Sequence, residues 1–485
     1  MVSRRSVIAV LSTLLFVTLL MVSGQNVYLT ILLGVFMFSL LYVVLNTNGN
    51  YFMIFYLCAF FIFLIARITA TALFGMKEKA YVPLLTDDAR NVTCVILSLS
   101  LISLMIGYRV KLKGFTSYRV KGLPYEVSDQ YMTALRAVSK YVFYIVESVV
   151  ILESLERAVY SQVFGYFESY VSYSSNIPYI VRMIADIEPV VLAVYLAAMP
   201  SKREIRGPFC FFVLGLIANV FGGTRYPLVS GILFALVYCL LRNETDSEVW
   251  IKKRTIILGV VFSPAAIVFL QFMSSWRLGG TPSYTAPIAE FMYSIGGSGY
   301  LIGYAEMYRG ELASRGIIYS FGRIWKLIFA NPISRNIFST VIYPSQTANN
   351  AMYGHSFANA ITYLLRPSAF LRGYGMGSSY IAELYTDFSY PGVVLGNLFI
   401  GGVIKKTREL EKNHFIKNFL CTFIIMMLLR IPRDSFDYFI VEFLGVKNIL
   451  TMMILHLWAI YRAKKVTSDP PVFPRSKPKH RTHSV

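Results

Sequence analysis

The stretch GYGMGSSYIAELYTDFSYPGVVLGNLFIGG, residues 373–402, joins a turn-forming segment to a membrane-spanning one. It begins with three glycines in five residues and carries two carboxylates, Glu383 and Asp387. It then continues without further charge into an apolar segment long enough to cross a bilayer. Glu383 and Asp387 are four residues apart and would share one face of a helix. The stretch therefore predicts a transmembrane helix with a glycine-rich, acidic segment at its beginning.

The composition is that of a membrane protein. Of the 485 residues, 56% are hydrophobic and only 15% are charged, and several apolar runs reach the ~20 residues that span a bilayer. The formal net charge of +20 indicates basic cytoplasmic loops rather than nucleic-acid binding. All five cysteines lie in or beside apolar runs and no C-x-x-C pair is present. Disulfide, zinc and redox sites are therefore not indicated.

Hydropathy predicts an all-α, polytopic fold with about twelve spans. The first apolar run follows Arg4 and Arg5 as in a signal peptide, but no A-x-A-like cleavage site follows it, so we predict an uncleaved span. If the N- and C-termini are cytoplasmic, every short inside segment is rich in Lys and Arg, as the positive-inside rule requires. The predicted spans are 6–22, 27–45, 51–74, 91–107, 140–160, 184–200, 208–222, 226–241, 255–273, 389–404, 418–431 and 446–462.

This topology divides the chain into four parts. Spans one to nine occupy 1–273, an extracytoplasmic loop occupies 274–388, spans ten to twelve occupy 389–465, and a disordered cytoplasmic tail occupies 466–485. We expect short helices in the loop, capping the active site, because a structureless loop of this length is uncommon. RIWKLIFA (323–330) predicts a helix in the headgroup layer. The many tyrosines of the loop would either form an aromatic belt or stack on sugars, and both interpretations stay open.

Most ionisable residues of the predicted spans lie near their outer ends. This distribution favours a reaction at the outer surface over transport through the core. Glu147 is the exception, nearer the inner half of its span. Two i,i+4 pairs, Glu153 with Arg157 and Arg182 with Asp186, could serve a ligand or simply neutralise each other. The secondary outer-face charges that we single out are Arg157, Arg182, Asp186 and Arg433.

Arg225 lies in the turn GGTRYP (222–227), between two predicted spans. A turn this tight has little reason to hold a lone guanidinium unless it binds an anion or a buried acid. The loop 274–388 adds eight cations against five acids, on the face where positive charge is normally scarce. Arginine binds phosphate oxygens in a fork and stays charged at any relevant pH. The expected partner is an anionic group at the outer surface, with a phosphorylated lipid as the first candidate.

The sequence lacks the motifs of several other chemistries. It has no P-loop, no G-x-S-x-G, no H-E-x-x-H and no D-x-D, and DIE (186–188) is only a weak metal signal. His355 is the one histidine expected in the loop; a lone histidine is more often structural, although its pKa range suits a general base. Arginine together with carboxylate or histidine remains. These groups suit substitution at a sugar carbon that bears a diphosphate leaving group, without a metal or other cofactor.

Two segments resemble bacterial O-antigen and capsule repeat-unit polymerases, the Wzy family. They are GSSYIAELYTDFSYPGVVLGNLFIGG (377–402), which is similar to the segment leading into a late span of that family, and GGTRYPLVSGILFALVY (222–238), which is similar to its Gly/Arg turn. The plan of about twelve spans with one large outside loop also matches. The usual FG of the family is FSYPG here (388–392), and the H-x7-G pattern of the related O-antigen ligases is not found around His355.

The resemblance implies a GT-C-like membrane glycosyltransferase. It would join undecaprenyl-diphosphate-linked oligosaccharide units into a surface polysaccharide at the outer face of the bacterial plasma (inner) membrane, and the partners that the resemblance implies are a flippase and a chain-length regulator. By position, Arg225, Glu383 and Asp387 match the family's turn arginine and acidic segment. The alternatives are a lipid-linked oligosaccharide flippase and a ligase-like glycan transferase.

These observations give a set of expected site residues. We expect His355, Glu383 or Asp387 to act as the general base, although the two acids could also only cap the helix that starts at Pro391. The residues that we expect to bind the diphosphate are Arg225, Arg277, Arg366 and Arg372.

Overall fold

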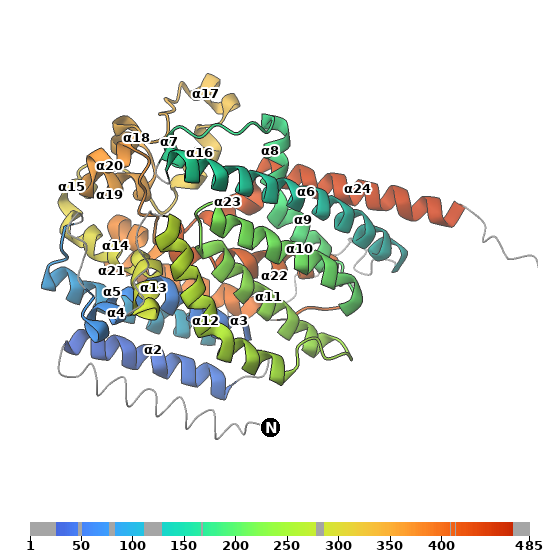
Figure 1. The fold of residues 1–485 in the computed structure, drawn as a ribbon, viewed down its shortest axis with the longest axis horizontal. Helices are drawn as coiled ribbons and strands as arrows, with labels where there is room; N and C mark the ends of the chain where they lie inside the picture. Colours follow the sequence, from blue (N-terminus) through green and yellow to red (C-terminus); the bar gives the residue numbers. More distant parts are fainter. Residues whose placement is uncertain are drawn as a thin grey trace, which may run out of the picture.

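The computed structural model is a bundle of helices with a cap of shorter helices at one end (Figure 1). It describes residues 26–46, 51–76, 83–110, 129–165, 168–277, 286–407, 409–412 and 414–468. Within these residues the regular structure is helical and no strand occurs, which confirms the predicted all-α class. The predicted first span, 6–22, and the tail from 469 onward lie outside the described residues.

Eight helices are long and apolar enough to cross a membrane, or nine if α23 and α24, bent by 48° at Gly445, count as one span. The chain is thus a multi-pass membrane protein. The spans are α2 (Val27–Leu45), α3 to α4 (Tyr51–Phe74), α5 (Asp87–Arg109), α10 (Lys202–Phe221), α11 (Tyr226–Thr245), α12 (Lys253–Arg277), α21 (Tyr380–Lys406), α22 (Phe415–Leu428) and the pair α23 (Tyr438–Leu444) with α24 (Val446–Ser468).

Two further predicted spans take a different form. The span predicted at 140–160 lies within α6 (Asp129–Phe164), a 36-residue helix that carries several charges. The span predicted at 184–200 is divided between α8 (Tyr179–Ala185) and α9 (Glu188–Ala197), and α9 is only ten residues long. Residues 190–197 are almost completely buried against α6 and α22, as expected for a helix that is apolar on every side. The total of twelve spans stays a prediction.

Helices α5 and α21 pack closely because each presents a glycine to the other. A Cβ at Gly107 would overlap the carbonyl oxygen of Leu398, and a Cβ at Gly401 would overlap the carbonyl oxygen of Leu104. Small residues allow helix backbones in membranes to approach in this way. Gly34 of α2 has no such neighbour, since a Cβ there meets nothing within 4 Å.

Replacing Gly401 by alanine should therefore separate α5 from α21 and destabilise the fold. Overpacking of this kind costs about 1–3 kcal/mol. Thermal unfolding of the detergent-solubilised protein measures the effect, with Gly34→Ala as the matched control. An unfolding midpoint for Gly401→Ala equal to that of the control would contradict the close packing.

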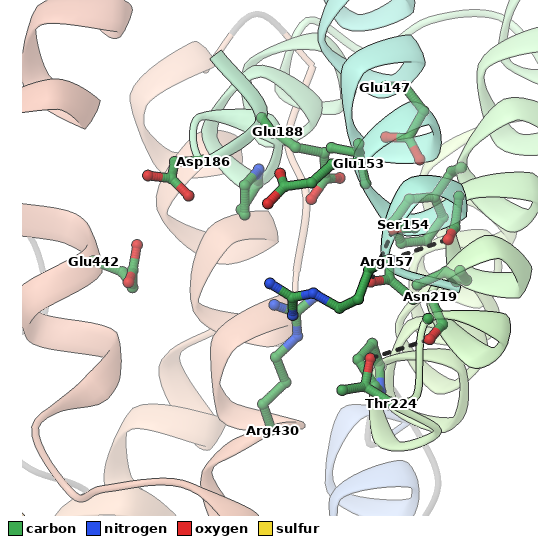
Figure 2. Close-up of a pocket in the computed structure, with 18 of the residues that line it drawn as sticks. Glu147, Glu153, Ser154, Arg157, Asp186, Glu188, Asn219, Thr224, Arg430 and Glu442 are labelled. Carbon is green, nitrogen blue, oxygen red and sulfur yellow. Dashed lines mark hydrogen bonds between the residues drawn. The ribbon is translucent and has the colours of Figure 1, made fainter. Parts of the chain in front are cut away.

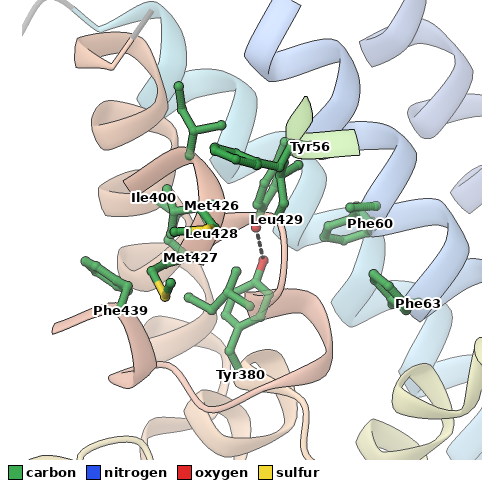
Figure 3. Close-up of a cluster of buried hydrophobic side chains, with 14 of the residues drawn as sticks. Tyr56, Phe60, Phe63, Tyr380, Ile400, Met426, Met427, Leu428, Leu429 and Phe439 are labelled. Carbon is green, nitrogen blue, oxygen red and sulfur yellow. Dashed lines mark hydrogen bonds between the residues drawn. The ribbon is translucent and has the colours of Figure 1, made fainter. Parts of the chain in front are cut away.

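The beginning of α21 lies inside the bundle. Tyr380, with 0% exposure, donates a hydrogen bond to Asn397 Oδ1 (2.7 Å) and receives one from the hydroxyl of Tyr56 (3.2 Å). Aromatic and aliphatic side chains of α3 and α22 surround this pair (Figure 3). The helix predicted to begin at 389 thus begins at Tyr380, and residues 380–385 belong to the core.

Helix α21 is broken near the middle of the quoted stretch. Ser389 has φ 55° and ψ −149°, a conformation that is not helical, and Pro391 follows two residues later. The hydroxyl of Ser389 accepts a hydrogen bond from Arg309 Nη2 at 3.2 Å. The break separates a short first part of the helix, residues 380–388, from the longer part that follows.

Residues 286–371 form short helices between α12 and α21 (Figure 1). The first two insert among the spans: α14 packs against α5 and α21, and Tyr300 and Leu301 are fully buried. The rest form the cap. The helices are α13 (Pro287–Ile295), α14 (Gly297–Met307), α15 (Arg309–Ala313), α16 (Gly322–Phe329), α17 (Pro332–Phe338), α18 (Ala348–Tyr353), α19 (Phe357–Leu365) and α20 (Pro367–Leu371).

Carboxylates of the bundle bind the cap through hydrogen bonds from its backbone N–H groups. Asp387 accepts hydrogen bonds from the backbone N–H groups of Tyr319 (2.9 Å) and Ser320 (2.6 Å). Asp437, which precedes α23, accepts from the N–H groups of Arg323 and Ile324, both at 2.8 Å. These last two donors belong to the first turn of α16, where a helix has unpaired N–H groups and favours negative charge.

Candidate functional site

A cavity of about 330 Å³ lies where α6, α8 to α9, the turn between α10 and α11, and the segment from Arg430 to Lys447 meet (Figure 2). Eight of its lining residues are carboxylates, arginines or lysines, and they come from segments far apart in the sequence: Glu147, Glu153, Arg157, Asp186, Glu188, Arg430, Glu442 and Lys447.

One face of α6 forms the first wall. Glu147, Val150, Ser154 and Arg157 recur at the spacing of a single helix face and all line the cavity. The opposing helix, α10, makes room for Glu147 with a glycine, since a Cβ at Gly215 would overlap Glu147 Oε1. This contact leaves Glu147 2% exposed at one end of the cavity.

The turn between α8 and α9 supplies the second wall, with Asp186 and Glu188. Glu188 is the first residue of α9 and Pro189 follows it, a position where helices favour both an acid and a proline. Because the rest of α9 is buried, the backbone of Glu188 is firmly supported. Asp186 forms an ion pair with Lys447 of α24 (Oδ2 to Nζ, 3.0 Å) at the rim of the cavity.

Two arginines face these acids. Arg157 lies over the ring of Tyr173 (5.3 Å to the centroid), and its Nε is buried without a hydrogen-bond partner. Arg430 is partly buried and donates a hydrogen bond to Tyr438. Both guanidinium groups point into the cavity toward Glu153 and Glu188 (Figure 2).

Neither arginine is neutralised by a direct contact. Among the residues that the structure describes, no carboxylate oxygen lies within ion-pair distance, 4.0 Å, of Arg157 or Arg430. Two carboxylate oxygens that line the cavity, Glu147 Oε2 and Glu188 Oε1, are likewise buried without a hydrogen-bond partner. Buried polar groups are normally paired, so an unpaired set of both signs around one cavity marks it as the candidate binding site. Its arginines suit a phosphate-type anion, and its carboxylates suit a proton acceptor.

Some of the residues expected from the sequence meet at this cavity. Arg157 and Asp186 line it, and Arg182 lies one turn before Asp186 on α8, with its guanidinium over Tyr179 (5.8 Å). Arg225 follows Thr224, another lining residue. Its Nη1 donates to Gln271 Oε1 at 3.3 Å, and Gln271 in turn donates to Glu290 on α13.

Glu383 and Asp387 lie outside this cavity lining and are engaged elsewhere. Glu383 is 2% exposed; its Oε1 accepts from Ser378 Oγ (2.6 Å) and its Oε2 from the N–H of Phe436 (2.9 Å). Asp387 holds the cap, as described above. Both acids therefore satisfy backbone donors, which favours a structural role. Their expected catalytic role stays a prediction.

His355 lies in the cap, stacked on Trp325 with a centroid distance of 4.0 Å. Its Nδ1 is 3.4 Å from the carbonyl oxygen of Ile318. Burial lowers the pKa of the His355 imidazole below its usual range, so the ring is neutral at pH 7. A neutral imidazole can accept a proton, but this one does not line the cavity.

The remaining expected arginines also lie apart from the cavity lining. Arg366 lies over Tyr374 (4.4 Å), and the Nε of the exposed Arg372 donates to Ser368 O (3.2 Å), both within the cap. Arg433 Nη1 donates to the carbonyl oxygen of Ile295 (2.9 Å), linking the end of α22 to α13. The side chain of Arg277, at the end of α12, lies outside the described part of the structure.

Several lining residues were not among those expected from the sequence. Arg430, Glu188, Glu153 and Glu147 are visible as charges in or beside apolar runs, which is a known signal of function. Lys447 and Glu442 lie at the beginning of the last apolar run, where such charges are ordinary. Only the fold shows that all of them share one cavity.

Comparison with known proteins identifies the family. The sequence profile of the O-antigen polysaccharide polymerase Wzy family matches residues 5–466, nearly the whole chain. No curated protein and no solved structure matches the chain significantly. The profile match confirms the resemblance seen in 222–238 and 377–402. This multi-pass membrane protein therefore belongs to the O-antigen polysaccharide polymerase Wzy family.

Proposed function

We propose that the protein joins undecaprenyl-diphosphate-linked oligosaccharide repeat units into a surface polysaccharide at the outer face of the plasma membrane. The observation that carries the proposal is the pair of arginines, Arg157 and Arg430, in a cavity where neither has a carboxylate in ion-pair contact. The family supports a polymerase of repeat units, and the arginines supply what a diphosphate leaving group requires.

In this proposal the donor diphosphate lies across Arg157 and Arg430, with Lys447 at the rim as a third cation. The acceptor sugar hydroxyl attacks the anomeric carbon of the donor, and the bond from that carbon to the diphosphate oxygen breaks. Negative charge then grows on the leaving diphosphate, and two fixed guanidinium groups stabilise it more in the transition state than in the ground state.

The volume of the cavity sets how much of the substrate it holds. At about 330 Å³ it is near the lower end of the ~300–1,000 Å³ typical of small-molecule sites. It would accommodate a diphosphate and the reacting sugar, with the rest of the oligosaccharide extending beyond it. Arg225, beside the lining residue Thr224, is our candidate for contact with the second lipid diphosphate. Diphosphate binding by Arg277, Arg366 and Arg372 stays a prediction.

The test is incubation of the purified protein with lipid-diphosphate repeat units alone. A ladder of products with increasing numbers of repeats is the expected result. Movement of the lipid between leaflets without any chemistry would indicate a flippase instead, and transfer only to a different glycan acceptor would indicate a ligase. Either of these two outcomes would replace the proposal. A flippase and a chain-length regulator are the partners that such a polymerase would work with in the cell.

A further inference from the structure

The carboxylates of the cavity are not needed to bind an anion, and their presence there calls for another role. Five acids line the same cavity as the two arginines. Placed near a diphosphate they would repel it, so a cavity that only bound the diphosphate would be better without them. Glycosyl transfer to a sugar hydroxyl, in contrast, requires a group that removes a proton.

We infer that Glu188 is the general base that takes the proton from the attacking hydroxyl of the acceptor sugar. This assignment rests on the proposed polymerase function. The general base must line the site, keep a free lone pair and be held in place by rigid structure. Glu188 meets these conditions: it lines the cavity, its Oε1 has no hydrogen-bond partner, and the buried helix α9 begins at this residue.

The other acids of the cavity meet fewer of these conditions. Glu147 also has an unpaired oxygen, but the residue is 2% exposed and lies against Gly215, whereas Glu188 is only partly buried, so a sugar hydroxyl has less access to Glu147. Asp186 is paired with Lys447. Glu153 lies one helical turn before Arg157 on α6 and, unlike Glu188, has no carboxylate oxygen that is both buried and unpaired. Glu442 lies on α23, away from the two guanidinium groups in Figure 2.

The position of Glu188 also suits the course of the reaction. Its carboxylate faces the guanidinium groups of Arg157 and Arg430, which in this proposal hold the donor diphosphate (Figure 2). The hydroxyl proton passes to Glu188, and the acceptor oxygen forms the new bond to the anomeric carbon. The electron pair of the broken bond leaves on the diphosphate. The products are the lengthened chain on its lipid, the free lipid diphosphate, and a protonated Glu188 that then loses its proton to water.

Glu188→Gln tests the assignment because it keeps the shape and removes the basic oxygen. Two measurements are made: affinity for undecaprenyl diphosphate alone in detergent, and the rate of polymer formation from native lipid-linked repeat units between pH 5 and pH 8. We expect binding within about twofold of the wild type and a loss of rate of about 10²–10⁴-fold. The wild-type rate should fall as the pH falls, because the base becomes protonated, and the residual rate of Glu188→Gln should not change with pH. Glu188→Asp, which keeps a carboxylate, should regain part of the rate.

Other outcomes overturn the inference. A Glu188→Gln rate within threefold of the wild type would do so, as would a loss of rate that is matched by a loss of undecaprenyl diphosphate binding. A flat pH profile in Glu153→Gln or Glu147→Gln, with the slope kept in Glu188→Gln, would assign the base to that residue instead. The absence of any polymer from the wild-type protein would reject the polymerase function itself, a result that is distinct from all of these.

Discussion

Arg430→Gln should abolish polymer formation and leave single-repeat lipid intermediates to accumulate. The substitution keeps a polar, hydrogen-bonding side chain, although a shorter one, and removes the charge that faces the cavity beside Arg157. A hydrogen bond to a charged group contributes about 1.5–3 kcal/mol, and loss of one donor to a developing anion typically lowers the rate by about 10²–10³-fold. Arg430→Lys keeps the charge without the planar fork, so we expect an intermediate loss.

The measurement is the length distribution of polysaccharide in cells that produce the variant as their only polymerase, together with the affinity of the purified variant for undecaprenyl diphosphate. Arg203→Gln, an exposed residue in the first turn of α10, is the matched control and should behave as the wild type. Full-length polymer in Arg430→Gln, with loss in Arg372→Gln, would move the diphosphate site to the cap, where sequence alone placed part of it.

Glu383→Ala should unfold much of the protein, whereas Glu383→Gln should fold and stay active. Alanine leaves the buried N–H of Phe436 without its acceptor, at a cost of about 1–3 kcal/mol, and adds the cost of a cavity in the core. Glutamine can present its carbonyl oxygen to that N–H and its amide group to Ser378 Oγ, which preserves both contacts. Native proteins are stable by only about 5–15 kcal/mol, so the expected loss of folding free energy in Glu383→Ala is a large share of the total.

Thermal unfolding in detergent and polymer formation are measured on both variants. If Glu383 were the general base, Glu383→Gln would fold normally and lose activity by about a hundredfold or more. That result would restore the catalytic role expected from the sequence and would remove the structural role proposed here.

The helical framework could be predicted from the sequence because apolar length and flanking charge are local signals. The ranges predicted at 27–45 and 51–74 coincide with α2 and with α3 to α4. The predictions were less accurate where polar residues, which suggest an exposed segment, are buried in the folded protein. The first part of α21 contains Glu383, Thr386 and Asp387 and looks like a polar approach to a span, yet it is helical from Tyr380 because the bundle satisfies its polar groups.

The candidate site could be predicted only in part. Arg157 and Asp186 stand out as charges at the ends of apolar runs, and both line the cavity. The function of Glu383 and Asp387 could not be predicted in the same way, because their partners include main-chain N–H groups of Phe436, Tyr319 and Ser320. A backbone N–H donor cannot be recognised from the residue type, because every residue except proline has one. A carboxylate that binds one is therefore indistinguishable, from sequence alone, from a carboxylate that binds a substrate.

The attachment of the cap has a consequence for how this protein can diversify. Asp387 and Asp437 bind N–H groups of Tyr319, Ser320, Arg323 and Ile324, and an N–H group is present whatever side chain the residue carries, proline excepted. The cap can therefore exchange its outward side chains over evolutionary time and remain docked in the same place. Variation of the outward side chains of the cap would allow related polymerases to accept repeat units of different sugars. The membrane bundle and its charged cavity would stay unchanged.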